Sequence, residues 1–405
     1  MTCTARDLEP NFGDFESGAL LMADARLMRV AERPQCIMVR GAGSYLWDHA
    51  GARYLDFVQG WAVNALGHAA PEISAALHEQ AQTLITASPA FHNAPQLALA
   101  HELVSATGLA SVYFGSSGAE ANEGALKLAR KWGRLERAGA SEIITTDGAF
   151  HGRTLALMAA SGKPGWDELF PPKMPGFVKV PFGDADAVAA HIGRKTAAVM
   201  VEPIQGEAGV VVPPDGYLLA LRALCDEHNL LLICDEIQTG MGRTGTLFAF
   251  EREGVRPDIL TLGKGLGGGV PISAVLANTR ASCFVPGDQG GTFGGNPLMT
   301  AVARRVLSIV SNGEFLAYVR ASGRRLEQRL AELCSKHGLG RRGRGLLWAL
   351  VLPSDTAERV LRTCFTRGLL LNAPRPNLLR LMPSLRVSAE EIDEMASVLD
   401  RALDA

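Results

Sequence analysis

Residues 258–273, DILTLGKGLGGGVPIS, decide how the rest of the sequence is interpreted. An apolar run at residues 259–262 leads to Lys264, which has a glycine on each side. A short apolar run followed by glycine is typical of a buried strand that enters a tight turn. The stretch therefore places one ammonium group at the end of a buried strand.

Three interpretations of Lys264 follow from the residues. A nucleotide-binding P-loop does not fit, because Gly265 stands where GxxxxGK[ST] requires Ser or Thr. A surface lysine on a glycine-rich turn is the default when the stretch is taken alone. The third is a Schiff-base lysine. Desolvation lowers the pKa of such a lysine, and its flanking glycines let a bulky aldehyde approach the backbone. This third interpretation requires partners elsewhere in the chain.

One partner is a carboxylate in LLLICDEIQTGMGRTG, where Asp235 ends another apolar run. The carboxyl ends of parallel strands are where α/β sheets bind ligands. A carboxylate there can hold a protonated pyridine nitrogen, which makes a pyridoxal ring an electron sink. The alternative is that Asp235 or Glu236 only caps the following turn.

A second partner is a phosphate seat in YFGSSGAEANEGALKLAR, which predicts a strand, the residues Ser116 to Ala119, and a helix. Free N–H groups at a helix start, together with two hydroxyls, attract an anion. An ordinary serine N-cap is the alternative, and by itself it is the more common one.

Composition limits the function classes. The chain has 405 residues, 47% hydrophobic residues, 20% charged residues and a formal net charge of −2, which argue against nucleic acid or an anionic membrane surface as the main partner. No apolar run approaches the ~20 residues of a membrane span, and the N-terminus lacks the pattern of a secretory signal. Seven scattered cysteines without CxxC spacing predict no disulfide framework and no metal site, and they fit the cytoplasm.

The order of the elements predicts an α/β fold. Short β-rich runs such as EIITT, TAAVMV and DILTL alternate with helical stretches, which indicates a largely parallel, buried sheet. After about residue 300, long amphipathic helices and further strands follow. We expect a large domain over residues 71–300, and a smaller α+β domain formed by residues 301–405 and part of residues 1–70, which begin with an N-terminal arm.

Several motifs in this order carry a family resemblance: SSGAEANEGALKLARKW, FHGRT, VEPIQGEAGVVVPPDGYL, LLLICDEIQTGMGRTG, DILTLGKGLGGGVPISA and GGTFGGNPL. From about residue 37 onward the chain resembles the class III pyridoxal-phosphate aminotransferases, in particular their acetylornithine/ornithine subgroup. The resemblance implies the type I fold of pyridoxal-phosphate-dependent transferases and pyridoxal 5′-phosphate as cofactor.

The resemblance also implies roles for the cofactor-binding residues. Lys264 would bind the cofactor covalently and carry the proton between the substrate carbon and C4′. Asp235 would pair with the pyridine nitrogen, Gln238 would bond the phenolic oxygen, and Phe150 would stack on the ring. An unrelated position in the core is the alternative for Phe150.

The phosphate of the cofactor would be bound by two chains. Ser117, Gly118 and Ala119 match the family's phosphate cup, whereas Thr292 matches a ligand that the second subunit supplies. The resemblance therefore implies a homodimer with shared active sites.

For the substrate, the resemblance implies two arginines. Arg153 would grip the carboxylate of an ω-amine donor with its planar fork. Arg380 would bind the α-carboxylate of 2-oxoglutarate and glutamate, and Glu207 would screen Arg380 while the donor is bound. A surface ion pair is the alternative for Arg153, and a turn position is the alternative for Glu207.

These residues predict a transaminase that moves the terminal amine of N-acetylornithine to 2-oxoglutarate. Ornithine, succinylornithine, diaminobutyrate, lysine and 4-aminobutyrate stay open as donors. A decarboxylase or racemase with the same cofactor, or a nucleotide-binding module using GKGLGGG, are the other hypotheses. Three residues depart from the family pattern, namely Ser116, Gly291 and Trp61; Trp61 either shapes the donor pocket or packs in an ordinary way.

Overall fold

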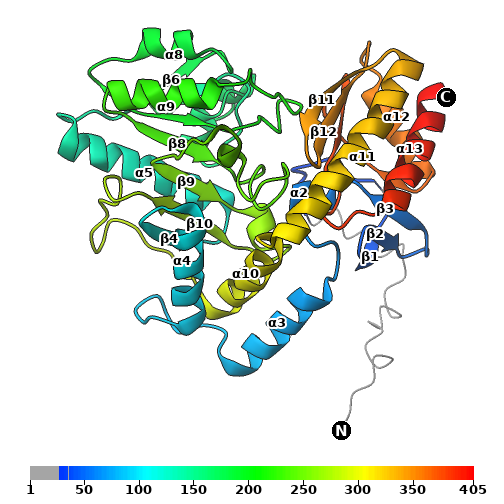
Figure 1. The fold of residues 1–405 in the computed structure, drawn as a ribbon, viewed down its shortest axis with the longest axis horizontal. Helices are drawn as coiled ribbons and strands as arrows, with labels where there is room; N and C mark the ends of the chain where they lie inside the picture. Colours follow the sequence, from blue (N-terminus) through cyan, green and yellow to red (C-terminus); the bar gives the residue numbers. More distant parts are fainter. Residues whose placement is uncertain (1–26, 35) are drawn as a thin grey trace.

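A computed structural model describes residues 27–34 and 36–405 (Figure 1), so most of the expected N-terminal arm lies outside the described residues. Its centre is a seven-stranded sheet. The strands occur in the order β4 (Ser111–Gly115), β10 (Ser273–Ala277), β9 (Ile259–Leu262), β8 (Leu231–Asp235), β7 (Thr196–Val201), β5 (Glu142–Thr146) and β6 (Phe177–Val180). The predicted α/β fold with a large sheet is confirmed.

The sheet is mostly parallel. Strands β9, β8, β7, β5 and β6 pair in parallel, while β10 runs antiparallel to both β4 and β9. Every residue of β7, β8 and β9 is buried. Both faces of these strands are covered, which explains why their sequences are continuous apolar runs rather than alternating ones.

Helices cover both faces of this sheet (Figure 1). Helix α5 packs on β9 and β10, whereas α9 packs on β7 and β8. Leu231 and Ile233 of β8 belong to the core on the α5 side, and Leu232 belongs to the core on the α9 side. The helices around the sheet are α3 (Pro71–Thr83), α4 (Ala94–Thr107), α5 (Gly118–Glu136), α6 (Leu155–Ala160), α7 (Trp166–Leu169), α8 (Ala185–His191), α9 (Tyr217–Glu227) and α10 (Pro297–Val310), with the 3₁₀ turns η2 (Ala249–Glu253) and η3 (Lys264–Leu266).

The two ends of the chain meet in one sheet. Its order is β1 (Met38–Ala42), β2 (Tyr45–Asp48), β3 (Arg53–Asp56) and β13 (Leu369–Leu370), and β13 pairs in parallel with β3. A third sheet has the order β11 (Gly340–Arg344), β12 (Leu347–Val351), β15 (Leu378–Leu381) and β14 (Asn372–Arg375). We call the part built on the seven-stranded sheet the large domain and the part built on these two sheets the small domain. The boundaries at residues 70 and 300 stay predictions.

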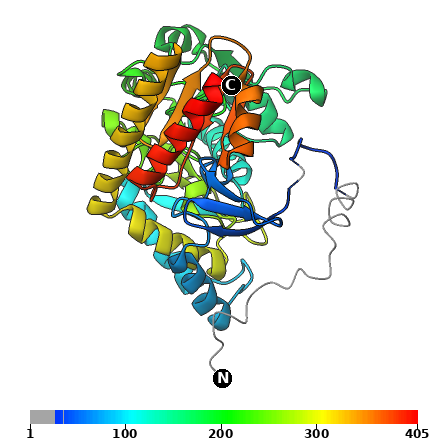
Figure 2. The same cartoon turned by 90° about the vertical axis from the view of Figure 1, so that its right-hand side faces the viewer.

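Three helices complete the small domain, namely α11 (Gly313–His337), α12 (Ala357–Thr366) and α13 (Ala389–Asp404). Helices α11 and α13 lie side by side (Figure 2), and Arg325 contacts Asp393 across them at 2.6 Å. The predicted capping box of α13 is present, because Ser388 and Glu391 satisfy each other's backbone N–H groups. Nowhere among the described residues is a helix both long and apolar enough to cross a bilayer.

Candidate active site

A cavity of about 280 Å³ opens at the carboxyl ends of β8 and β9. It is close to the lower end of the ~300–1,000 Å³ that small-molecule sites occupy. Eight residues predicted from the sequence line it: Gly118, Ala119, Phe150, Arg153, Glu207, Asp235, Gln238 and Lys264. The predicted residues Ser117, Thr292 and Arg380 are not part of its lining.

Lys264 begins η3, two residues after β9 ends. Its φ angle of 40° lies in the left-handed region, where a residue with a side chain is strained. Burial lowers the pKa of its ammonium group to about 8, because a low-dielectric surrounding disfavours the charged form. A substantial fraction of the neutral, nucleophilic amine is therefore present near neutral pH, as the third interpretation of this lysine requires.

The glycines beside Lys264 allow close packing of the protein around the lysine. A Cβ atom on Gly263 would lie 3.3 Å from Ile237, and one on Gly265 would lie 3.2 Å from Met241. The expectation that these glycines also let a bulky aldehyde approach the backbone stays a prediction.

Asp235 ends β8, next to Thr261 on the parallel strand β9. Its carboxylate accepts hydrogen bonds from the side chains of Asn122 at 2.7 Å and Thr261 at 3.4 Å, and it lies 2.8 Å from Nδ1 of His151. The backbone N–H of Ile237 adds a fourth contact at 3.1 Å. With only 4% of its surface exposed, the Asp235 side chain is held in one place on the cavity wall.

Sequence reasoning missed His151 and Asn122. His151 stands inside the quoted FHGRT, and Asn122 lies one turn into α5 between two glutamates, so neither differed from its polar neighbours in the sequence. Asn122 also accepts a hydrogen bond from Thr261 at 2.8 Å and donates to the carbonyl of His151 at 2.7 Å. The two residues therefore orient the Asp235 carboxylate and are positioning residues.

The N-terminus of α5 forms the opposite end of the cavity. Ser117 is its N-cap, and a capping box joins Ser117 with Glu120, whose carboxylate accepts the N–H groups of Ser116 and Ser117. The N-cap alternative is thus realised, and the Ser117 hydroxyl is engaged in it. The N–H groups of Gly118 and Ala119 remain at the positive end of the helix and line the cavity, which suits an anion.

Two features test whether pyridoxal 5′-phosphate fits. Both polar atoms of the buried Gln238 amide lack a partner among the described residues, although the side chain borders the cavity. A buried amide normally has hydrogen-bond partners, so a ligand oxygen there would remove a cost of about 1–3 kcal/mol. A Cβ on Gly206 would lie 1.5 Å from Oε1 of Gln238, so glycine is required beside this amide.

Together the residues fit the group. An anion seat, an unsatisfied amide, an acidic partner and an amine of lowered pKa line one cavity, and they suit the phosphate, the phenolic oxygen, the ring nitrogen and the aldehyde of the cofactor, respectively. Their individual roles stay predictions.

A second carboxylate, Glu202, also borders the cavity and was missed by sequence reasoning. It accepts the backbone N–H of Phe150 at 3.0 Å. Burial is the main reason why the pKa of Glu202 is raised well above its usual value, and the charge of Asp235 raises it further. The sequence VEPIQGE contained this residue, but its raised pKa depends on its burial beside Asp235.

Trp166 organises the donor side of the cavity. Its ring makes an edge-on contact with Phe150 at 5.6 Å between centroids, and the guanidinium of the exposed Arg153 lies 5.6 Å from it. Cation–π contact of this kind contributes about 0.5–1 kcal/mol at an exposed site. Trp166 therefore contacts two predicted site residues at once, and sequence reasoning missed it.

Glu207 and Arg380 form an ion pair at 2.7 Å. Arg380, on β15, has no exposed surface and lies behind Glu207; it also donates to Asn372 and to the carbonyl of Gly206, both at 2.9 Å. Burial alone would raise the pKa of Glu207, but the adjacent Arg380 holds this pKa below its usual value. The structure thus brings together two residues that are 173 positions apart in the sequence.

Trp61 stands over this ion pair, 5.7 Å from the Arg380 guanidinium, with half of its surface exposed. It belongs to α2 (Gln59–Ala62), a turn in which all four residues have φ between 48° and 68°. A left-handed turn costs roughly 1–2 kcal/mol for each residue with a Cβ. The Asp56 carboxylate offsets part of this cost by accepting the N–H groups of Val58 and Gln59.

Thr292 and Gly291 lie on an exposed loop, outside the cavity of this chain. Asn93 donates a hydrogen bond to the carbonyl of Gly295 at 3.0 Å, so this loop adjoins the segment before α4. Large apolar side chains on the two segments are exposed, with Phe91 at 69% and Phe293 at 66%.

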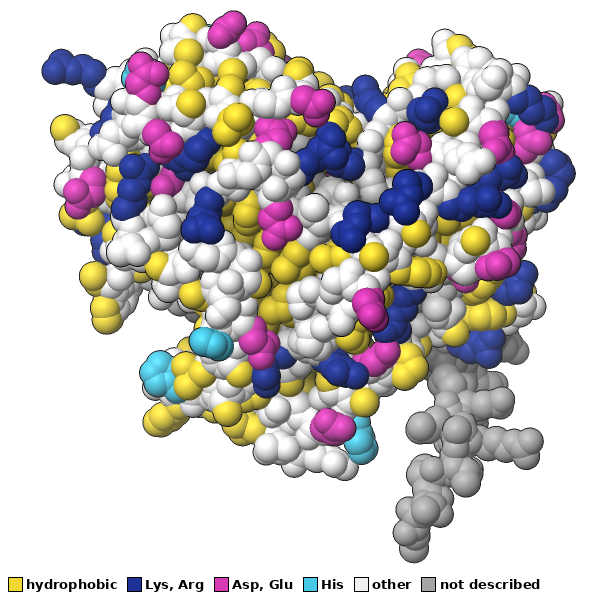
Figure 3. Space-filling view, viewed as in Figure 1, with side chains coloured by type: hydrophobic (Ala, Val, Ile, Leu, Met, Phe, Trp, Pro, Cys, Tyr) yellow, Lys and Arg dark blue, Asp and Glu magenta, His cyan; other side chains and the backbone are white. Residues whose placement is uncertain are grey.

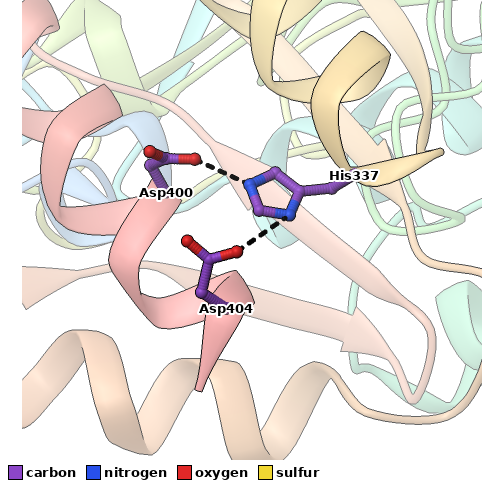
Figure 4. Close-up of side chains that lie close together, drawn as sticks. All are labelled: His337, Asp400 and Asp404. Carbon is purple, nitrogen blue, oxygen red and sulfur yellow. Dashed lines mark hydrogen bonds and ion pairs between the residues drawn. The ribbon is translucent and has the colours of Figure 1, made fainter.

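One further group of potential ligands lies far from this cavity, where α11 and α13 end (Figure 4). His337 contacts Asp400 at 2.7 Å and Asp404 at 3.7 Å. Lys336 binds the same two carboxylates at 2.8 Å and 3.3 Å. Because the Lys336 ammonium group already binds both carboxylates, this cluster is an ion-pair link between the two helices.

Comparison with known proteins shows the family of the chain. The family model "Aminotransferase class-III" matches residues 27–403. Acetylornithine aminotransferase 2 of Bordetella bronchiseptica is 53% identical over 383 residues, which cover 94% of this chain and 97% of that protein.

Two solved structures are also similar. The ornithine aminotransferase of Toxoplasma gondii ME49 has a TM-score of 0.93 at 32% identity, covering 99% of this chain and 98% of that one. The N-acetylornithine aminotransferase of Stenotrophomonas maltophilia K279a has a TM-score of 0.82 at 38% identity, covering 95% and 98%. The chain therefore belongs to the class III aminotransferase family, whose members use pyridoxal 5′-phosphate.

Proposed function

We propose that this aminotransferase takes the terminal amine of an ω-amino acid, with N-acetylornithine as the first choice, and transfers it to 2-oxoglutarate to give the semialdehyde and glutamate. The observation that carries the proposal is the Glu207–Arg380 ion pair at 2.7 Å beside the cavity. A carboxylate that neutralises a buried arginine and can be displaced from it is needed only by an enzyme whose two substrates place their carboxylates at different positions. The name of the B. bronchiseptica relative, at 53% identity, supports the choice of donor.

The bound cofactor would supply the aldehyde and the electron sink. Lys264 would then hold and move the proton at the substrate carbon, since a lysine with a pKa of about 8 can both accept and return it near neutral pH. Asp235 would keep the ring nitrogen protonated, and His151 and Asn122 would hold its carboxylate in place. Gln238 would complete its unsatisfied hydrogen bonds with the phenolic oxygen.

The two half-reactions would use the substrate-binding residues differently. In the first, Arg153 would grip the donor's carboxylate while Glu207 neutralises Arg380. In the second, the α-carboxylate of 2-oxoglutarate would displace Glu207 and bind Arg380. For a donor with a free α-amine, such as ornithine, the ion pair would thereby penalise the reversed binding mode, in which that α-amine would react; the α-nitrogen of N-acetylornithine is acylated and does not react.

We also propose a homodimer with shared active sites, located in the cytoplasm. Exposed apolar side chains beside the Thr292 loop, such as Phe91 and Phe293, support a covering partner, because large exposed apolar patches usually mark interfaces. Thr292 would then reach the phosphate end of the partner's cavity. The six cysteines among the described residues are free, which agrees with a reducing compartment.

A panel of donors with 2-oxoglutarate held constant tests the proposed reaction. Glutamate formation is measured for N-acetylornithine, N-succinylornithine, ornithine, diaminobutyrate, lysine and 4-aminobutyrate. We expect the highest kcat/KM for N-acetylornithine. Comparable kcat/KM for 4-aminobutyrate would exclude the proposed donor, and product formation without any amino acceptor would instead indicate a decarboxylase or racemase.

A further inference from the structure

A second cavity, of about 470 Å³, lies between the two domains. The large domain contributes the loop after Arg243 and the turn η2, and the small domain contributes α11 and the β11–β12 hairpin. None of the residues that line it also lines the active-site cavity. Figure 3 shows Lys and Arg side chains gathered beside a hollow in the surface, over α11 and the adjoining edge of the small domain.

The walls of this cavity carry an excess of positive charge. The ionisable residues in the lining are Arg252, Arg320, Arg324, Arg344 and Glu327. Four guanidinium groups thus face one carboxylate, which leaves a net charge of three positive units. Burial is the main reason why the pKa of Arg344 is lowered. The nearby Arg252 lowers it further, because the two cations repel each other.

The surrounding protein does little to compensate this charge. Arg344 has an acidic neighbour in Asp215, but at 3.8 Å and with 87% of the Asp215 side chain exposed. Arg320 donates only to the carbonyl of Gly245, at 3.1 Å. Among residues 27–34 and 36–405, neither Arg252 nor Arg324 forms an ion pair within 4.0 Å. Three of the four arginines thus lack an acidic partner within 4.0 Å in the described part of the chain, and the partner of the fourth is exposed, which favours a bound anion.

A buried hydroxyl provides independent evidence for a ligand. Thr244 lines the same cavity, has only 7% of its surface exposed, and its Oγ1 has no hydrogen-bond partner in the described structure. A buried hydroxyl without a partner costs about 1–3 kcal/mol. An oxygen atom of an anion between the arginines would accept this hydrogen bond.

The loop that carries Thr244 is held rigidly. The preceding residue, Arg243, is buried and donates to the carbonyls of Leu346 at 3.1 Å and Pro383 at 2.5 Å in the small domain. The aromatic part of the lining is Trp348, which is only 5% exposed and whose indole N–H is bonded to Gly345. The cavity therefore offers charge and hydrogen bonds but no exposed ring on which a nucleobase could stack.

We propose that this cavity binds a small anion with at least two acidic groups, and that the anion bridges the two domains. The arginine fork matches phosphate and carboxylate oxygens equally well, so a pyrophosphate-like compound and a polycarboxylate share the required chemistry. Because the ligand contacts both domains in the folded protein, its binding stabilises the native state by mass action.

Isothermal titration calorimetry of the holoenzyme with pyrophosphate, and separately with citrate, tests the proposal at constant ionic strength. We expect saturable binding of at least one probe, with an increase in Tm that saturates over the same concentration range. Stronger binding of pyrophosphate identifies the phosphate class, and stronger binding of citrate identifies the polycarboxylate class. The absorbance of the cofactor is recorded throughout, to show that the probe has not displaced it.

Variants separate a specific site from general attraction. Arg324→Gln should weaken binding about tenfold or more, since one charged hydrogen-bond donor is lost. Thr244→Val should weaken it several-fold without any change in charge. Arg362→Gln is the matched control, because Arg362 is an exposed arginine that pairs with Glu358 within α12; its affinity should equal that of the wild type.

Two results would overturn the proposal. One is the absence of saturable binding for both probes. The other is equal affinity in Arg324→Gln and Arg362→Gln. If Arg324→Gln does not yield folded, coloured protein, Arg252→Gln replaces it, because Arg252 lies on the opposite wall and is itself exposed.

Discussion

The two halves of the active-site cavity are built in different ways. The cofactor half rests on the ends of β8 and β9 and on the start of α5, and its central carboxylate, Asp235, is 4% exposed and held by several hydrogen bonds. The substrate half is assembled from loops, a left-handed turn and β15. Of its two arginines, Arg153 lies against the Trp166 ring, and Arg380 pairs with the Glu207 carboxylate and also donates to Asn372 and Gly206.

This difference suits the chemistry. The cofactor is the same in every turnover, so its binding groups gain from being fixed before it arrives. Two substrates of different length must use the other half in turn, so its charges have to be exchangeable. Changes in the cofactor half should therefore impair both half-reactions equally, whereas changes in the substrate half should separate them.

The largest effect is expected from Lys264→Ala. Turnover should fall about 10⁴-fold or more in both half-reactions, because the variant loses the nucleophile and the proton carrier together. Borohydride should fix the cofactor to Lys264 of the wild type, as peptide mapping would show. Lys195→Ala, at an exposed lysine, is the control; labelling of another lysine would contradict the assignment.

Asp235→Asn should retain the cofactor but reduce single-turnover rates about 10²–10³-fold in both directions, because an amide does not keep the ring nitrogen protonated. Asp258→Asn is a matched control, since Asp258 is also buried but precedes β9 at the opposite edge of the sheet. The control should lose stability and keep its rate constants. A rate for Asp235→Asn within a few-fold of the wild type would remove Asp235 from the mechanism.

Arg380→Ala and Glu207→Ala should separate the half-reactions in opposite directions. Arg380→Ala should weaken 2-oxoglutarate use about 10²-fold or more, as expected for the loss of one partner of a buried charge pair. Glu207→Ala should accelerate the glutamate half-reaction and slow or misdirect the ω-amine half-reaction. Stopped-flow absorbance follows both; an unchanged donor preference in Glu207→Ala would show that no such screen operates.

Arg153→Ala should reduce the rate of the ω-amine half-reaction about 10–100-fold, because a charged hydrogen bond of roughly 1.5–3 kcal/mol is lost. The rate of the glutamate half-reaction should stay nearly unchanged. Trp166→Leu should have a smaller effect of the same kind, with KM rising more than kcat falls, because Arg153 loses its support. Rate constants measured separately for the two half-reactions test this prediction. Equal losses in both half-reactions would contradict a role restricted to the donor.

Glu202→Gln should change stability rather than selectivity. The pKa of Glu202 is raised in the folded state, so its contribution to stability is fully present below the unfolded pKa and is lost as pH rises towards the folded value. An amide cannot ionise, and the apoprotein variant should therefore gain about 1 kcal/mol relative to the wild type at pH 8 but little at acidic pH. Thermal unfolding at both pH values measures this; a pH-independent difference would argue against a neutral Glu202.

Much of the cofactor half could be predicted from the sequence, because its residues stand next to element boundaries. Lys264 and Asp235 follow apolar runs, and Gly118 and Ala119 follow a serine N-cap, so the rule that ligands bind at the carboxyl ends of parallel strands places them at one edge. The features that sequence reasoning missed concern neighbours in space. The glycines beside Lys264 pack against Ile237 and Met241, which lie more than twenty residues away in the chain.

The sequence by itself determined the strand-rich core, its alternation with helices, the capping boxes and the edge of the sheet at which the site lies, because all of these depend on periodicity and local hydrogen bonding. Only the tertiary structure decided which charges meet. It placed Trp166 against Arg153, buried Glu202 beside Asp235, and brought arginines of both domains into one cavity with Thr244, whereas the Glu207–Arg380 pair was already implied by the family resemblance. The strand β11, with the sequence GRRGR, exists only because β12 pairs with it. Such contacts join residues distant in the chain, and their energies depend on burial, which no local pattern of residues encodes.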